Sequence, residues 1–192
     1  MNSPSTAYAD MHIKGGVLRS RFLYVLMNHG LDVWTTVLEQ LSEADRAALS
    51  EIEIDHWYTL ALLDRVDNAI ADVLDGNPEA IFQKLGEFSA TSNLSGAYSS
   101  LLDADIHAFL RQTALIHRSY QDFGTATYEE LSPNSGMLKI NYDTPPPVSY
   151  CASGTEYFRR AIEICGAENP RVLHTRCTGR GDAFCEFYAT WQ

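Results

Sequence analysis

The feature that most constrains the fold is a change in the spacing of apolar residues near Gly124. Before this point, apolar side chains recur every three or four residues, which places them on one face of an α-helix. After it, residues 125–131 and 137–142 are richer in Thr, Tyr and Ile and flank a Ser-Pro-Asn-Ser-Gly turn, a pattern typical of a β-hairpin. We therefore expect an α+β domain in which a helical N-terminal half packs on a small antiparallel sheet.

Start and stop signals divide the chain further. The predicted helices cover residues 17–29, 33–41, a segment after the N-cap Ser42, 57–74, a segment opened by Pro78, a segment that starts at Asp103 or Asp105, and 155–165. Residues 171–191 follow a break at three consecutive prolines and are predicted to form two strands around a Gly-containing turn at 178–182. We expect residues 1–10 to be a flexible tail and residues 11–192 to form a single domain.

Composition excludes several classes of partner. The formal charge of −11 would repel a phosphate backbone, so direct binding of nucleic acid is not expected. The apolar stretches fall far short of the roughly 20 residues that span a bilayer, and Met1 to Asp10 lacks the features of a secretory signal. We therefore expect no membrane association and a cytoplasmic location, where cysteines are more readily metal ligands or core residues than disulfides.

All four cysteines lie in the last 42 residues. Cys177 and Cys185 flank the predicted turn and become cross-strand neighbours if the flanking strands pair. Cys151 and His174 would complete a set of three sulfurs and one imidazole, which suits tetrahedral Zn²⁺. Four protein ligands leave no position for substrate, so this zinc would be structural. The alternative is a group of buried core cysteines, which is the role we expect for Cys165.

One geometric condition accompanies this prediction. His174 and Cys177 have opposite parity along a strand, and alternate residues of a regular strand point to opposite faces. A bulge or a strand end must therefore lie between them if both are to reach one metal ion.

The C-terminal segment has a further resemblance. Cys177 and the run Gly181-Asp182-Ala183-Phe184-Cys185-Glu186-Phe187 resemble the closing motif of the 4-vinyl reductase domain family. That family shares its fold with the haem nitric-oxide-binding domain and a TRAPP tethering subunit, and it includes the aromatic-sensing domains of phenol-responsive bacterial activators. In those sensors three cysteines and a glutamate hold zinc. Cys151, Cys177 and Cys185 match the cysteines, and His174 stands where the glutamate is expected.

The resemblance implies a ligand pocket between the long helices and the sheet. The primary hypothesis is a sensory or regulatory domain that binds an aromatic or other hydrophobic ligand, with His107 and His117 as polar anchors. The candidate pocket residues are Trp57, Tyr98, His107, Phe109, His117, Tyr120 and Tyr142. We expect a homodimer and a separate output protein as partners.

Two alternatives remain open. The first is a haem-based sensor of NO or O₂ with His107 or His117 as the axial iron ligand, although the Tyr-x-Ser-x-Arg signature of the haem-NO family is absent. The second is an enzyme of tetrapyrrole or aromatic metabolism. The sequence contains no phosphate-binding Gly-rich loop, no nucleophile elbow and no HExxH motif, so we do not expect an enzyme.

Overall fold

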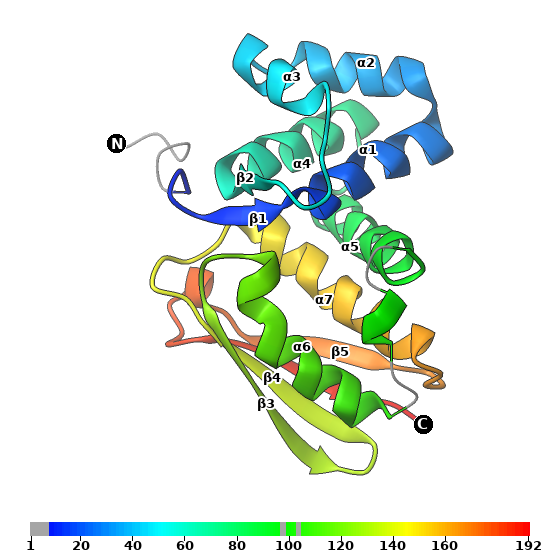
Figure 1. Cartoon of the computed structure of the whole chain (residues 1–192), viewed down its shortest axis with the longest axis vertical. Coiled ribbons are helices and arrows are strands. Elements are labelled where there is room, and N and C mark those ends of the chain that lie inside the picture. The colour runs from blue at the N-terminus through cyan, green and yellow to red at the C-terminus, as the bar shows by residue number, and fades with distance from the viewer. Residues whose placement is uncertain (1–7, 97–98, 103–104) are drawn as a thin grey trace.

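The computed structural model describes residues 8–96, 99–102 and 105–192 and places the helical half above a C-terminal sheet (Figure 1). The helices are α1 (Gly15–His29), α2 (Leu31–Glu39), α3 (Glu43–Leu49), α4 (Leu60–Leu74), α5 (Pro78–Leu94), α6 (Ile106–Tyr120) and α7 (Val148–Ile164). The strands are β1 (His12–Lys14), β2 (Trp57–Thr59), β3 (Thr125–Ser132), β4 (Ser135–Asn141), β5 (Arg171–Arg176) and β6 (Cys185–Thr190). The predicted α+β architecture is confirmed.

Side-chain caps explain where several helices begin. Ser42, Thr59, Asn77 and Asp105 each accept a hydrogen bond from a backbone N–H in the first turn of the helix that follows. Such a bond satisfies a donor that has no partner within the helix. Ser42, the Pro78 start and Asp105 agree with the sequence prediction.

Two helix starts differ from the prediction by three residues or more. The helix expected from Trp57 begins at Leu60, because residues 57–59 pair with β1 as an antiparallel strand. The helix expected from Thr155 begins at Val148, directly after the proline run, with Pro147 in an extended N-cap conformation. Proline fixes a backbone angle that suits a helix start, so the break in the chain is also the beginning of α7.

The larger sheet is antiparallel in the order β3-β4-β6-β5. Its buried face includes Leu138, Ile140, Phe187 and Ala189, which share a core with residues of α6 and α7. A shift of register lies between His174 and Arg176, where β5 ends. This irregularity meets the geometric condition that the opposite parity of His174 and Cys177 imposes.

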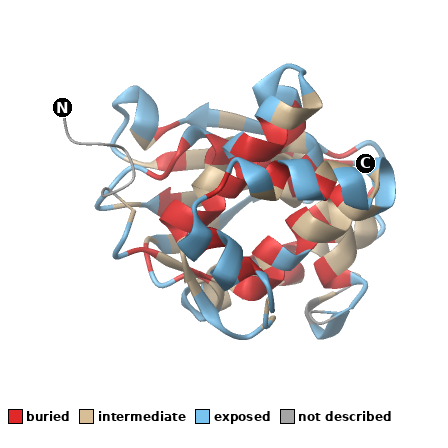
Figure 2. Cartoon of the chain, turned by 90° about the horizontal axis from the view of Figure 1, so that it is seen from above, coloured by how far each residue is buried: buried red, intermediate tan, exposed pale blue. Residues whose placement is uncertain are grey.

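Two apolar cores meet along α5 and α7, which run side by side in the middle of the molecule (Figure 1). Buried residues concentrate on the faces of the helices that point inward (Figure 2). The two helices come close at Gly86, where an added Cβ would lie only 1.9 Å from the carbonyl oxygen of Ser153. No helix among the described residues is both long and apolar enough to cross a membrane.

A buried ion pair ties the same region together. Arg21 of α1 donates through Nε to Asp67 of α4 at 2.9 Å, and both side chains are at most 1% exposed. The same guanidinium donates to the carbonyl oxygen of Leu85 on α5 and to Ser153 Oγ on α7. One side chain therefore connects four helices, and its charge is paired as burial requires.

Replacing Gly86 with Ala tests the close contact between α5 and α7. The added methyl group would overlap the backbone of Ser153, so we expect G86A to lower the free energy of unfolding by about 1–3 kcal/mol in urea titrations. Gly154→Ala on α7 is the matched control, because its Cβ would lie 3.9 Å from Phe187 and cause no overlap. Equal stability of the two variants would contradict this account of the contact.

Candidate functional site: a Cys/His cluster beside an apolar cavity

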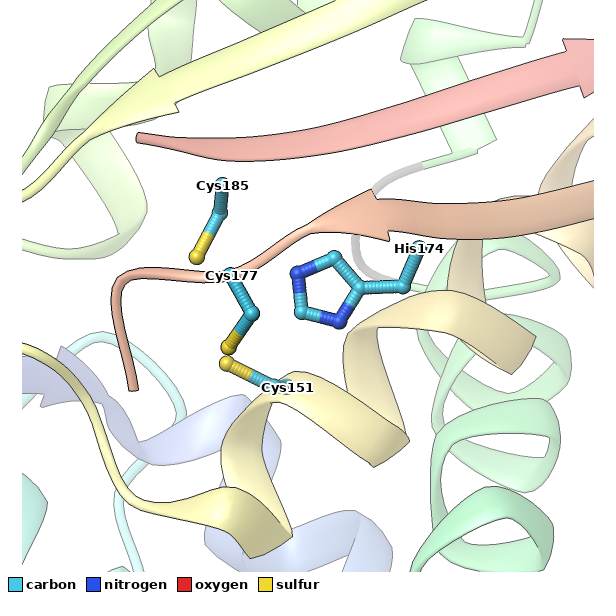
Figure 3. Close-up of side chains that lie close together, drawn as sticks. All are labelled: Cys151, His174, Cys177 and Cys185. Atoms are coloured by element: carbon cyan, nitrogen blue, oxygen red, sulfur yellow. The ribbon is translucent and has the colours of Figure 1, made fainter. Parts of the chain in front are cut away.

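The structure brings Cys151, His174, Cys177 and Cys185 together, with one ligand atom of each residue within 4.8 Å of every other (Figure 3). Cys151 lies in the first turn of α7, His174 on β5, Cys177 just after β5 and Cys185 at the start of β6. The register shift after His174 allows its ring and the Cys177 thiol to reach the same point. Three cysteines of the cluster are buried.

The His174 ring is held in place but has an unsatisfied nitrogen. It stacks on Phe187, with ring centroids 4.5 Å apart and planes inclined by 7°. Its Nε2 atom is buried, and no described residue forms a hydrogen bond with it. A buried ring nitrogen without a partner is costly, so this atom is suited to coordinate an ion.

The pKa values of the Cys151 and Cys185 thiols depend strongly on each other. A hydrogen bond from the Cys151 thiol lowers the pKa of Cys185, and the same contact together with burial raises the pKa of Cys151. Neighbouring negative charges disfavour ionisation, so three thiols this close require a cation before all three can become thiolates. Ligand atoms around zinc, at about 2.3 Å from the metal, lie about 3.8 Å apart at the corners of a tetrahedron. The cluster therefore needs only a small contraction to accept such an ion.

A cavity of about 160 Å³ lies beside the cluster. Its walls come from the end of β1, from α1, α5, α6 and α7, from Gln121 just after α6, from β4 and the residue Tyr142 that follows it, and from β6. The lining residues are Lys14, Val17, Arg21, Ser89, Asn93, Leu94, Phe109, Thr113, Ile116, His117, Tyr120, Gln121, Ile140, Tyr142, Tyr150, Cys151, Ser153, Gly154, Tyr157, Phe158 and Phe187. The wall is mostly apolar and aromatic, as in ligand pockets of proteins.

Polar groups gather on one part of this wall. The Tyr150 hydroxyl donates to Gln121 Oε1, and Gln121 Nε2 lies 2.9 Å from His117 Nε2. His117 Nε2 also lies 3.2 Å from the carbonyl oxygen of Phe123. Burial lowers the pKa of His117 to about 4, so its imidazole is neutral at physiological pH. Burial raises the pKa values of Tyr142 and Tyr150, which keeps both phenols protonated.

The residues chosen from sequence divide into three groups. Phe109, His117, Tyr120 and Tyr142 line the cavity. His107 and Trp57 are not among the cavity residues, and Tyr98 lies outside the described residues.

The side chains of His107 and Trp57 have other contacts. His107 Nδ1 lies 2.6 Å from the Tyr128 hydroxyl, and its Nε2 lies 3.1 Å from the carbonyl oxygen of Pro133. The ring of Trp57 lies under the Lys14 ammonium group.

Sequence reasoning missed Gln121, Tyr150 and Tyr157. Gln121 follows the last residue of α6, where helical periodicity no longer applies. Tyr150 and Tyr157 belong to α7, and the predicted start of that helix at Thr155 left Tyr150 outside any element. The proline run before Val148 was the signal that could have extended the helix and revealed this face.

Comparison with known proteins gives a result at the level of fold. No protein-family profile and no curated protein matches the chain. An H-NOX protein from Shewanella oneidensis, solved in the Fe(II)NO ligation state, is similar in structure with a TM-score of 0.74 and 15% identity, over 94% of this chain and 99% of that one. An unliganded Fe(II) H-NOX protein from K. algicida has a TM-score of 0.70 and 12% identity, over 94% and 97% of the two chains.

These similarities correct part of the sequence interpretation. They do not support the resemblance to the 4-vinyl reductase family, whose closing motif is short. They do support the haem-NO-binding type of fold that the resemblance implied, over nearly the whole chain. The chain has the fold of the H-NOX proteins.

Proposed function

We propose that this chain is a sensory domain that binds haem in the cavity and uses the iron to detect a diatomic gas such as NO or O₂. The observation that carries the proposal is a neutral histidine, His117, in the cavity wall of a fold shared with H-NOX proteins in Fe(II) and Fe(II)NO states. Haem iron would supply the site that binds the gas. The similarity to H-NOX structures supports this function better than the aromatic or other hydrophobic ligand favoured by the sequence.

The lining residues fit haem in their chemistry. A neutral imidazole keeps one lone pair. In the tautomer whose Nε2 donates to Phe123, that lone pair is on Nδ1 and is available to iron, and Gln121 Nε2 is then only a close neighbour of the ring. Lys14 also lines the cavity, but its ammonium group donates to the carbonyl oxygen of Asp55 at 2.6 Å and lies over the Trp57 ring, so it would have to turn from these partners to reach a carboxylate of the macrocycle. His107 fits less well, because both of its ring nitrogens have protein partners away from the cavity.

A second candidate ligand is favoured by the size of the cavity. A volume of about 160 Å³ is close to that of the engineered cavity of about 150 Å³ that binds benzene. A single aromatic ring therefore enters without displacement of the walls, whereas haem requires the wall side chains to move apart. A polar substituent on such a ring would be oriented by the polar side chains of the cavity wall, which are His117, Gln121, Tyr142 and Tyr150.

We also propose that the Cys/His cluster binds a structural zinc ion. The support is the convergence of three thiols and an imidazole, and above all the buried His174 Nε2 that lacks a protein partner among the described residues. Four protein ligands close the coordination sphere, so the ion would stabilise the junction of α7 with β5 and β6 and would not bind substrate.

Titration with haemin tests the haem proposal. We expect one equivalent to bind with a saturable Soret band that shifts when CO is added to the reduced protein. His117→Ala should weaken binding or change the spectrum, and added imidazole should restore the spectrum by occupying the space left by the side chain.

His107→Ala is the matched control, because His107 is on the same helix but not in the cavity wall. Loss of haem binding in H107A alone would assign the axial ligand to His107. If haemin does not bind at all, the haem proposal is wrong, and binding of phenol followed by calorimetry would support the second candidate.

The neutral state of His117 predicts a dependence of stability on pH. Between its unfolded pKa near 6.5 and its folded pKa of about 4, the unfolded chain binds a proton that the folded chain does not. Stability from this group is therefore present above pH 6.5 and lost as the pH falls toward 4, by at most about 3 kcal/mol. We expect His117→Gln to have a shallower loss of stability over this range in urea titrations. Parallel pH profiles for the two proteins would refute the neutral state.

Elemental mass spectrometry tests the zinc proposal. Protein purified without a metal-binding tag should contain one equivalent of zinc, and Cys177→Ser or Cys185→Ser should remove most of it. Cys165→Ser is the matched control, because it makes the same chemical change outside the cluster and should retain the metal. Absence of zinc from the wild-type protein, with no uptake on addition, would reduce the cluster to core cysteines.

A further inference from the structure

We propose that metal binding at the Cys/His cluster and ligand binding in the cavity are energetically coupled, each strengthening the other, because the two sites share one wall. The proposal rests on the two sites of the proposed function. It adds a link between them: Cys151 and Phe187 belong to the cavity wall, and each also belongs to the cluster or contacts it directly.

The first link runs through α7. Cys151 provides one of the four candidate ligand atoms and also lines the cavity. The next two turns of α7 supply Ser153, Gly154, Tyr157 and Phe158 to the same cavity. Fixing the Cys151 sulfur on a metal therefore fixes the start of the helix that forms one side of the ligand site.

A chain of polar contacts extends this link across the cavity. Tyr150, the residue before Cys151, donates to Gln121, and Gln121 contacts His117. A change in the position of the first turn of α7 therefore reaches the histidine proposed to hold the iron. The path is short and consists of residues that all line the cavity.

The second link runs through β6. Phe187 stacks on the His174 ring on one side and lies 5.3 Å from the ring of Phe158. Coordination of His174 holds its ring in one orientation, and that ring supports Phe187. Two independent ligands of the cluster thus position two different parts of the cavity wall.

The sign of the coupling follows from preorganisation. Without a metal, three adjacent thiols and an unsatisfied imidazole favour rearrangement of the first turn of α7, so a ligand must order the wall as it binds. When the metal is bound, the wall is already ordered, so ligand binding does not include the free-energy cost of ordering it. By reciprocity, the factor by which the metal strengthens ligand binding equals the factor by which the ligand strengthens metal binding, and we expect about tenfold.

Hydrogen exchange tests the mechanical link without any cavity ligand. Wild-type protein would be stripped with a chelator, and zinc then added back. We expect zinc to slow amide exchange in residues 174–186 and also in residues 150–158 and at Gln121. Slower exchange confined to residues 174–186 and to the first turn of α7 around Cys151 would overturn the coupling while leaving the zinc site intact.

Binding measurements then test reciprocity. The dissociation constants of haemin and phenol would be measured with and without zinc, and zinc affinity would be measured against a chromophoric chelator with and without the probe that binds. If zinc lowers the dissociation constant of the probe about tenfold and the probe lowers that of zinc by the same factor, the proposal is supported. If neither dissociation constant changes, the proposal is overturned. Failure of both probes to bind refutes the proposed cavity ligands, and the exchange experiment still decides the link.

Phe187→Leu separates coupling from general stabilisation. This variant keeps all four candidate metal ligands but removes the ring between His174 and Phe158. We expect it to retain zinc and to show a smaller coupling factor than the wild type. An unchanged factor would exclude the β6 link, and the exposed control Leu173→Thr should leave the factor unchanged.

Discussion

The contact between α5 and α7 is the constraint on which the rest of the structure depends. Gly86 permits the approach, since any side chain at that position would overlap the backbone of Ser153. Arg21 then binds across the contact through Asp67, Leu85 and Ser153. Removing one partner of such a buried ion pair typically costs about 3–5 kcal/mol, because the remaining charge is left without compensation. The helical half and the sheet half are thereby held in one arrangement.

That arrangement determines the position of α7, and α7 determines both candidate sites. Its first turn carries Cys151 toward β5 and β6, where His174, Cys177 and Cys185 converge. The following turns form one wall of the cavity. The register shift at the end of β5 completes the cluster by bringing together two residues that a regular strand would separate. Both candidate sites thus depend on the packing of α7 against α5, and the Cys/His cluster depends also on the register shift at the end of β5.

The sequence could predict those parts of the fold that depend on local spacing. Caps such as Ser42 and Asp105, and the hairpin of β3 and β4, follow from residue type and periodicity. The strands β1 and β2 have three residues each, too few for a pattern, and their pairing joins positions 43 to 47 residues apart. The composition of the Cys/His cluster was predicted from its unusual residues, whereas the cavity combines common aromatic residues from many elements, and only contacts distant in sequence bring them together.

A shared fold constrains the ligand less than the side chains do. The similar H-NOX structures are 10–16% identical to this chain, so the architecture persists while most side chains differ. On α6, His107 is held by Tyr128 and Pro133, and His117 is a neutral group in the cavity wall. The two histidines lie ten positions apart on one helix, yet of the two only His117 lines the cavity. The proposed iron site therefore depends on His117 and on its contact with Gln121, which in turn accepts a hydrogen bond from Tyr150, and not on the fold alone.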